Sequence, residues 1–170
     1  PTANEYKTLT AGAGMTIVHG VGSITFTSTA AMTALVRAFA AVNQLVGLAV
    51  DTSIALATES FDTDGVFAGS VFTAPATGKY KLCLHISGIA AGATAAETRM
   101  YLNGAPGVGT IIATAPTYLG AIVVEFGWEL NALIALTAGD TIQFSLFAPT
   151  NNVTIQGGTT KTWFDIMRVA

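Results

Sequence analysis

From residue 66 to the C-terminus, the chain is a succession of short β-type runs that end at turn-forming residues. The runs are rich in Val, Ile, Thr and aromatic residues, and they follow one another at intervals of roughly 8–12 residues. In residues 80–87, apolar side chains alternate with more polar ones, which is typical of a strand that buries one face. A series of about seven such strands predicts an all-β sandwich or barrel.

The remaining strands and the connections between them follow from the same pattern. The Asn103-Gly104 pair is a strong hairpin signal, and Gly139-Asp140 marks another turn. The other strands are predicted at residues 66–73, 99–102, 109–114, 120–130, 141–147 and 161–169. The connections are predicted at residues 74–79, 88–97, 103–108, 113–119, 137–140 and 148–160.

The composition indicates that the chain associates with other copies. Hydrophobic residues make up 51% of the 170 residues and charged residues only 10%, against roughly 25% charged in typical soluble domains. A lone domain of this size has too little interior for so much apolar surface, so subunit interfaces are expected. The net charge of −3 without a basic patch argues against nucleic acid as a partner. No apolar run reaches the ~20 residues of a membrane-spanning helix, so membrane insertion is not expected.

The opening stretch LTAGAGMTIVHGVGSITFTS, residues 9–28, also has apolar side chains that need a packing partner. It holds two β-type runs, residues 15–18 and 24–27, with Gly-bearing turns between them. A two-stranded hairpin is at best marginally stable in water. We therefore expect its apolar side chains to pack against other copies of the chain. The alternative is a frayed N-terminal arm on a monomer.

Four motifs in order resemble the jelly roll of the complement globular-head and tumour necrosis factor-like family. FDTDG and FTAPATGKYKLCLHISG, from Phe61, resemble its opening strands. LTAGDTIQFSLFA resembles its penultimate strand, and TWFDIMRVA resembles its last. The resemblance covers residues 34–170 and implies a jelly-roll β-sandwich. It also makes residues 36–43 the first strand, although the spacing of Leu35, Phe39, Val42 and Val46 by itself favours an amphipathic helix.

The opening stretch resembles the β segments ahead of the tip domain in phage tail fibres and bacterial fibre proteins. Both resemblances imply a homotrimer, which physical reasoning alone would not choose over a dimer. The expected organisation is a trimeric β collar in residues 1–31 and a jelly-roll head in residues 32–170. Strands that are apolar on both faces are buried on both. The trimer interface is accordingly predicted at Ile17, Ile24, Phe26, Phe126, Trp128, Phe164 and Ile166.

Strand parity places the recognition loops. If the head begins and ends at the stalk, the connections at residues 88–97, 113–119 and 148–160 lie at the far end. Loops on a rigid scaffold commonly carry recognition. An aromatic ring can stack on a sugar, and amides and hydroxyls can bond its hydroxyl groups. The candidate ligand-binding residues are Tyr118, Asn151, Asn152, Gln156 and Thr159; the alternative for each is an ordinary solvated loop residue.

The residues offer little for catalysis or for a metal ion. His19 and His85 are the only imidazoles, and DTDG lacks the ligand spacing of a calcium loop. Glu125 and Glu129 lie four apart on one predicted strand, ~13 Å from each other, too far for a glycosidase pair within one chain. The chain is therefore expected not to be an enzyme and to need no cofactor or metal.

The function expected from these observations is attachment at an extracellular fibre tip, on a phage tail or a bacterial cell. The far-end loops would contact a glycan or a protein on a host or prey cell surface, with avidity from three sites. The alternative is a purely structural trimerisation or virion-decorating domain without a ligand.

Overall fold

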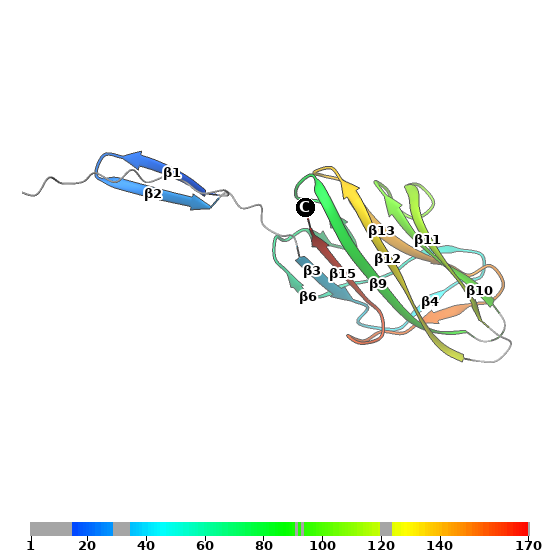
Figure 1. Cartoon of the computed structure of the whole chain (residues 1–170). Coiled ribbons are helices and arrows are strands. Elements are labelled where there is room, and N and C mark those ends of the chain that lie inside the picture. The colour runs from blue at the N-terminus through cyan, green and yellow to red at the C-terminus, as the bar shows by residue number, and fades with distance from the viewer. Residues whose placement is uncertain (1–14, 29–34, 91, 93, 120–123, 170) are drawn as a thin grey trace, which may run out of the picture. The chain divides into compact units, whose positions relative to one another are not determined.

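The computed structural model describes residues 15–28, 35–90, 92, 94–119 and 124–169 (Figure 1). The chain divides into two compact units, Pro1–Met32 and Thr33–Ala170. All regular structure in the described residues is β-strand. None of these residues forms a helix of the length and hydropathy needed to cross a membrane.

The described part of the first unit is a β-hairpin. β1 (Met15–Gly20) pairs antiparallel with β2 (Ser23–Ser28), and Gly22 takes a φ of 76° in the turn, a conformation that suits glycine. The hairpin was predicted from the sequence. Its apolar side chains stay uncovered within one copy, with Val18 54%, Ile24 47% and Phe26 57% exposed.

The second unit is a sandwich of a six-stranded and a seven-stranded sheet. The six-stranded sheet has the order β11-β10-β13-β8-β7, with β5 also paired to β13. Its strands are β5 (Asp51–Ser53), β7 (Phe67–Ala68), β8 (Val71–Thr73), β10 (Thr94–Leu102), β11 (Thr110–Leu119) and β13 (Thr141–Phe147).

The seven-stranded sheet has the order β4-β14-β9-β15-β3-β6, with β12 on the other edge of β9. Figure 1 shows β9 and β12 running side by side over their whole lengths. The strands are β3 (Leu35–Phe39), β4 (Gln44–Val46), β6 (Thr58–Asp62), β9 (Gly78–Ala90), β12 (Val124–Leu136), β14 (Val153–Ile155) and β15 (Trp163–Arg168).

The core lies between the two sheets. Alternation in β9 turns Leu82, Leu84 and Ile86 inward, each at most 1% exposed. Aromatic rings join the sheets: Phe164 of β15 lies 4.9 Å from Phe144 of β13 and 5.9 Å from Phe67 of β7, between ring centroids. The all-β sandwich predicted from strand spacing is confirmed, and residues 35–39 form a strand rather than a helix.

Two predicted connections are wrong because they are largely strand. β9 continues to Ala90 and β10 begins at Thr94, so most of residues 88–97 is paired. β11 runs through residues 113–119 despite Pro116, since a proline is tolerated in an edge strand. The predicted loop at residues 148–160 contains β14, which pairs with both β4 and β9.

The strands end at two opposite ends of the sandwich. At the near end, Val169 N donates to Lys79 O (2.8 Å) and Asn103 Nδ2 donates to Asp140 Oδ1 (2.8 Å). Ala90 marks the far end, where it pairs with both Val124 and Val153. β3 begins opposite Met167, so the described head starts and finishes at the near end. This arrangement confirms the strand parity inferred from the sequence.

Candidate functional site

Four of the five predicted ligand-binding residues flank β14, and the fifth, Tyr118, lies in β11. Asn151 is half-buried and Asn152 is exposed in the turn before β14, while Thr159 is exposed in the segment after it. Gln156 is held by the scaffold, because its Oε1 accepts a hydrogen bond from Ser87 Oγ at 2.7 Å and its N donates to Ser87 O at 2.8 Å. Tyr118 lies in β11 opposite Ala95, and its side chain is outside the described part of the structure.

A far-end feature that sequence reasoning missed is the segment of residues 40–50 between β3 and β5, which includes the short strand β4 and is here called the far-end loop. Large aliphatic side chains in this loop point to solvent, namely Val42 (73% exposed), Leu45 (63%), Leu48 (53%) and Val50 (55%). The signal was present in the sequence, since no charged residue stands between Arg37 and Asp51. From the sequence, this segment was considered only as a helix or as the first strand, whereas its aliphatic side chains lie at the surface.

The far end as a whole is poor in charge. No Asp, Glu, Lys or Arg occurs in residues 38–50, 86–96, 109–124 or 148–160, which hold the far-end strand termini and connections. Glu125, next along β12, is paired with Lys161. These far-end segments therefore present aliphatic, amide and hydroxyl groups.

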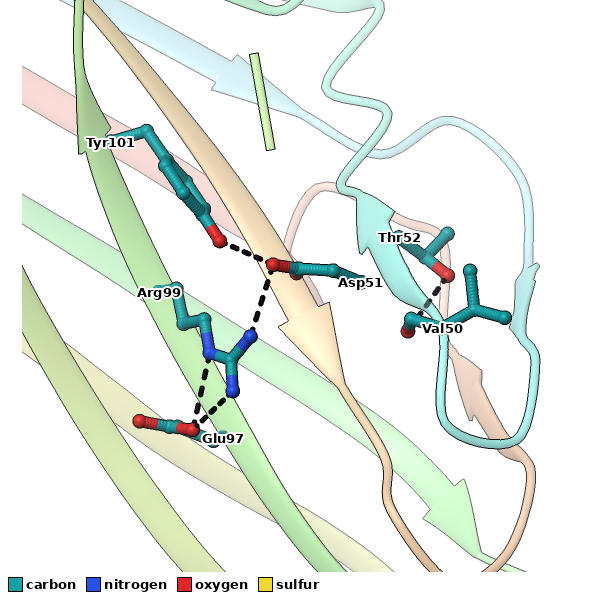
Figure 2. A network of polar contacts seen from close by, with 6 residues as sticks. All are labelled: Val50, Asp51, Thr52, Glu97, Arg99 and Tyr101. Atoms are coloured by element: carbon teal, nitrogen blue, oxygen red, sulfur yellow. Dashed lines mark hydrogen bonds and ion pairs between the residues drawn. The ribbon is translucent and has the colours of Figure 1, made fainter. Parts of the chain in front are cut away.

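Just beside the far-end loop, the outer face of the six-stranded sheet carries a polar network (Figure 2). Arg99 of β10 donates from Nη1 to Asp51 Oδ2 (3.1 Å) and from Nη2 to Glu97 Oε2 (2.8 Å). The Tyr101 hydroxyl donates to the same Asp51 oxygen. The Arg99 guanidinium lies 4.4 Å from the centroid of the Phe147 ring, a cation–π contact. The network ties β5 to the sheet and pairs one guanidinium with two carboxylates, which leaves one excess negative charge.

The network holds Asp51 ionised. Burial opposes the charged form, but hydrogen bonds from Ser145, Tyr101 and Arg99, with the positive charge of Arg99, outweigh it. The pKa of Asp51 is therefore lowered below its ordinary value of 3.8. A lowered carboxyl pKa contributes stability that is present above the unfolded-state value and is lost as the pH falls through the folded-state value.

We expect Asp51→Asn to make the melting temperature of the protein depend less strongly on pH in the acid range. At neutral pH the variant should melt at a lower temperature than the wild type, because Asn cannot pair with Arg99 as an anion. As the pH falls below about 4, the wild type loses this contribution and the two melting temperatures converge. Circular-dichroism melts across the acid range measure the difference, and curves that stay parallel would contradict this role of Asp51.

The outward side of the seven-stranded sheet, here called the open face, carries a row of interacting side chains. Trp163 stacks on His85 (5.6 Å between centroids, 14° between planes), and the Arg37 guanidinium lies 4.8 Å from the Trp163 ring. Arg37 Nη1 contacts Asp165 Oδ2 at 3.4 Å, and His85 Nδ1 lies 3.6 Å from Glu129 Oε1. The row crosses four neighbouring strands, β3, β15, β9 and β12.

Toward the near end, the open face becomes apolar and grooved. A groove of about 230 Å³ is lined mainly by apolar side chains such as Leu35, Phe61 and Met167, and the charged residues Lys81 and Asp165 also line it. Phe61 is 41% and Met167 40% exposed, and Leu133 on β12 is 65% exposed. One copy of the chain leaves this apolar surface in water.

Solved structures of other proteins share this arrangement of strands. The Eiger TNF of S. frugiperda matches with a TM-score of 0.62 at 10% identity, over 81% of this chain and 93% of that one. Murine APRIL matches with a TM-score of 0.61 at 12% identity, over 81% of this chain and 99% of that one. The globular domain of the zebrafish complement 1qA protein matches with a TM-score of 0.53 at 16% identity, over 81% of this chain and 98% of that one. The fold is a tumour necrosis factor-like jelly roll. At this identity the likeness concerns the fold. Neither a protein-family model nor a curated protein matches the sequence.

Within the jelly roll, two of the predicted trimer-interface residues are core residues instead. Phe164 is 0% and Ile166 1% exposed in a single copy, so neither can contact a neighbour. Alternation along β15 places Trp163 and Met167 on the opposite, open face. The prediction for Phe164 and Ile166 is wrong, because alternation separates the two faces of a strand without telling which is inside.

The other predicted interface residues are half-buried or exposed in a single copy. Phe126 and Trp128 stack at 4.8 Å on the core side of β12, and both are half-buried. Trp128 Nε1 donates to Thr98 Oγ1 of the opposite sheet at 2.7 Å. On the hairpin, Ile17 is half-buried, while Ile24 and Phe26 are exposed. Their contacts with other copies stay predictions.

The open-face thiol is chemically quiet. Burial, reinforced by the carboxylates of Glu129 and Asp165, raises the pKa of Cys83 to about 11. The described residues hold no group of three or more His, Cys, Asp or Glu side chains arranged for a metal ion. Glu129 and Glu125, the carboxylates weighed for glycan hydrolysis, contact His85 and Lys161.

We expect iodoacetamide to alkylate Cys83 at least about tenfold more slowly than free cysteine near pH 7.5, because the thiolate is the nucleophile. The rate should climb as the pH approaches 11, the value to which the pKa of Cys83 is raised. Mass spectrometry of timed samples measures the rate. Alkylation at the speed of free cysteine would contradict the burial of this thiol.

Proposed function

We propose that the chain is the head of a homotrimeric extracellular fibre and attaches to a cell surface through its far end. The observation that carries the proposal is the open face, which combines a half-buried aromatic row with an exposed apolar groove. Soluble monomers rarely expose apolar patches without a partner. Two further copies of the chain would cover this face and the hairpin at the same time.

The open face suits self-association better than ligand binding. Arg37 and Asp165 form an ion pair on this face, so these two charges are partly compensated when water leaves. The apolar groove and the exposed Met167 and Leu133 supply surface for burial. In the expected trimer, the open face of each copy packs against the other copies. The outer face of the six-stranded sheet and the far end stay accessible.

The far end suits the contact with a target. The described head starts and finishes at the near end, which leaves the far-end loops free of chain connections to the rest of a fibre. Three copies would present three equal far ends, and several fibres on one particle would multiply them. Weak single contacts would then add up through avidity. Binding rather than catalysis is the proposed activity.

Immobilised arrays of bacterial surface glycans and surface proteins test the proposal. The wild type should bind at least one class of target. A variant that cannot assemble should bind at least about tenfold more weakly, because it loses avidity. Silence across both arrays with an intact trimer would contradict the proposal and favour a purely structural or virion-decorating head.

A further inference from the structure

The far-end loop, residues 40–50 with the short strand β4, presents its aliphatic side chains in a fixed conformation. Gln44 anchors it, because its Nε2 donates to Ser53 O (2.6 Å) and its Oε1 accepts from Ala55 N (2.9 Å). Ala49 N donates to Ala148 O at 2.8 Å, and β4 pairs with β14. We call Val42, Leu45, Leu48 and Val50 the aliphatic ledge.

The backbone of this loop is strained next to the ledge. Ala49 takes a φ of 55°, in the left-handed region that residues with a Cβ atom seldom adopt. Its neighbours Leu48 and Val50 are both more than half exposed. Strained backbone of this kind is kept where the surrounding structure enforces it, often at binding sites. Here the hydrogen bond to Ala148 enforces it, and the result is a preorganised display of two aliphatic side chains.

The ledge lies in a segment without charged residues, and the charged groups beside it, Asp51, Arg99 and Glu97, form a network with one excess negative charge. The charged residues that flank the loop in sequence are both engaged, Arg37 with Asp165 and Asp51 with Arg99. The other far-end segments, including residues 148–160, carry no charge. A charged group of a partner that lies against the ledge side chains would lose its hydration without gaining a counter-charge from them.

We propose that the aliphatic ledge binds an uncharged, apolar surface patch on a target protein. The inference rests on the proposed function and names the class of its target. Protein interfaces have charge-depleted, apolar centres with polar rims, which the ledge and the nearby Asn43 and Asn152 reproduce. Residues 40–50 contain no aromatic ring on which a sugar would stack, and no Trp, Tyr, Lys or Arg of the kind that anchors a protein in a lipid surface.

A displayed library of random peptides, panned against the full chain, supplies the probe. Selected peptides are synthesised, and their affinities are measured for the wild type and for Leu45→Asp and Leu48→Asp, both at exposed positions. Val108→Asp is the matched control, since Val108 is 85% exposed in the turn between β10 and β11 at the near end. Unchanged melting temperature and mass show that each variant is folded and assembled.

The expected result is a set of apolar, uncharged peptides whose binding weakens at least about tenfold in both ledge variants and less than about twofold in Val108→Asp. Peptides that bind the far end but depend on Asn152 or Thr159 instead would overturn the ledge and leave the proposed function standing. Peptides that ignore every far-end substitution would count against both. The wild type and the same variants are also tested for binding to neutral glycan arrays and to phosphatidylcholine vesicles. If the wild type binds glycans or vesicles, the ledge variants do not, and no peptide binds, then the target of the ledge is not a protein.

Discussion

Replacing Phe164 by Asp should prevent the head from folding, and not merely from assembling. The Phe164 side chain is 0% exposed and contacts Phe67 and Phe144 of the opposite sheet. Truncating a buried Phe costs about 3–5 kcal/mol, and an unpaired buried carboxylate adds to that cost. A typical domain is stable by only about 5–15 kcal/mol.

Soluble yield, near-ultraviolet circular dichroism and thermal melting measure this effect. Phe164→Leu is the matched control, because it keeps the position apolar, and it should fold with a lowered melting temperature. A Phe164→Asp variant that melts like the wild type would show that β15 turns its other face to the core.

Replacing Met167 by Asp should have the opposite outcome, a folded head that no longer assembles. Met167 is 40% exposed on the same strand as Phe164 and lines the apolar groove of the open face. In one copy an Asp there stays in water at little cost, whereas in the trimer its charge would be desolvated in each of the three copies. We expect the mass in solution to fall to that of one chain.

Light scattering together with circular dichroism separates loss of assembly from loss of fold. Leu133→Asp, on β12 of the same face, should behave like Met167→Asp. Val108→Asp adds the same charge away from the open face and should leave assembly intact. If Met167→Asp and Leu133→Asp both keep the wild-type mass, the subunits meet through another surface.

The fold could be predicted where local pattern and tertiary environment agree. The strand at Thr141–Phe147 has clear alternation and a Gly-Asp turn before it, and its predicted bounds match the structure. The prediction of a loop at residues 88–97 is wrong because Ala and Gly have low β propensity, which is overridden by pairing of residues 88–90 with β12 and β14 and of residues 94–97 with β11. The same override turned the helical spacing around Leu35 into a strand that pairs with β15.

The site could be predicted only in part, because period-2 alternation defines two faces without assigning the inner one. Phe164 was assigned to the interface, whereas it lies in the core and its neighbour Trp163 lies on the open face. The far end was located by counting strands. Its aliphatic loop was missed because exposed Leu48 and Val50 are indistinguishable in sequence from core residues, and their exposure depends on the contact of Ala49 with Ala148.

The central claim is that the open face and the hairpin of one copy are covered by two others. The mass of the full chain in solution, measured by light scattering at several dilutions, tests it most directly. We expect about three times the 17.4 kDa of one chain at every dilution. A well-folded particle with the mass of a single chain at all dilutions would contradict the claim.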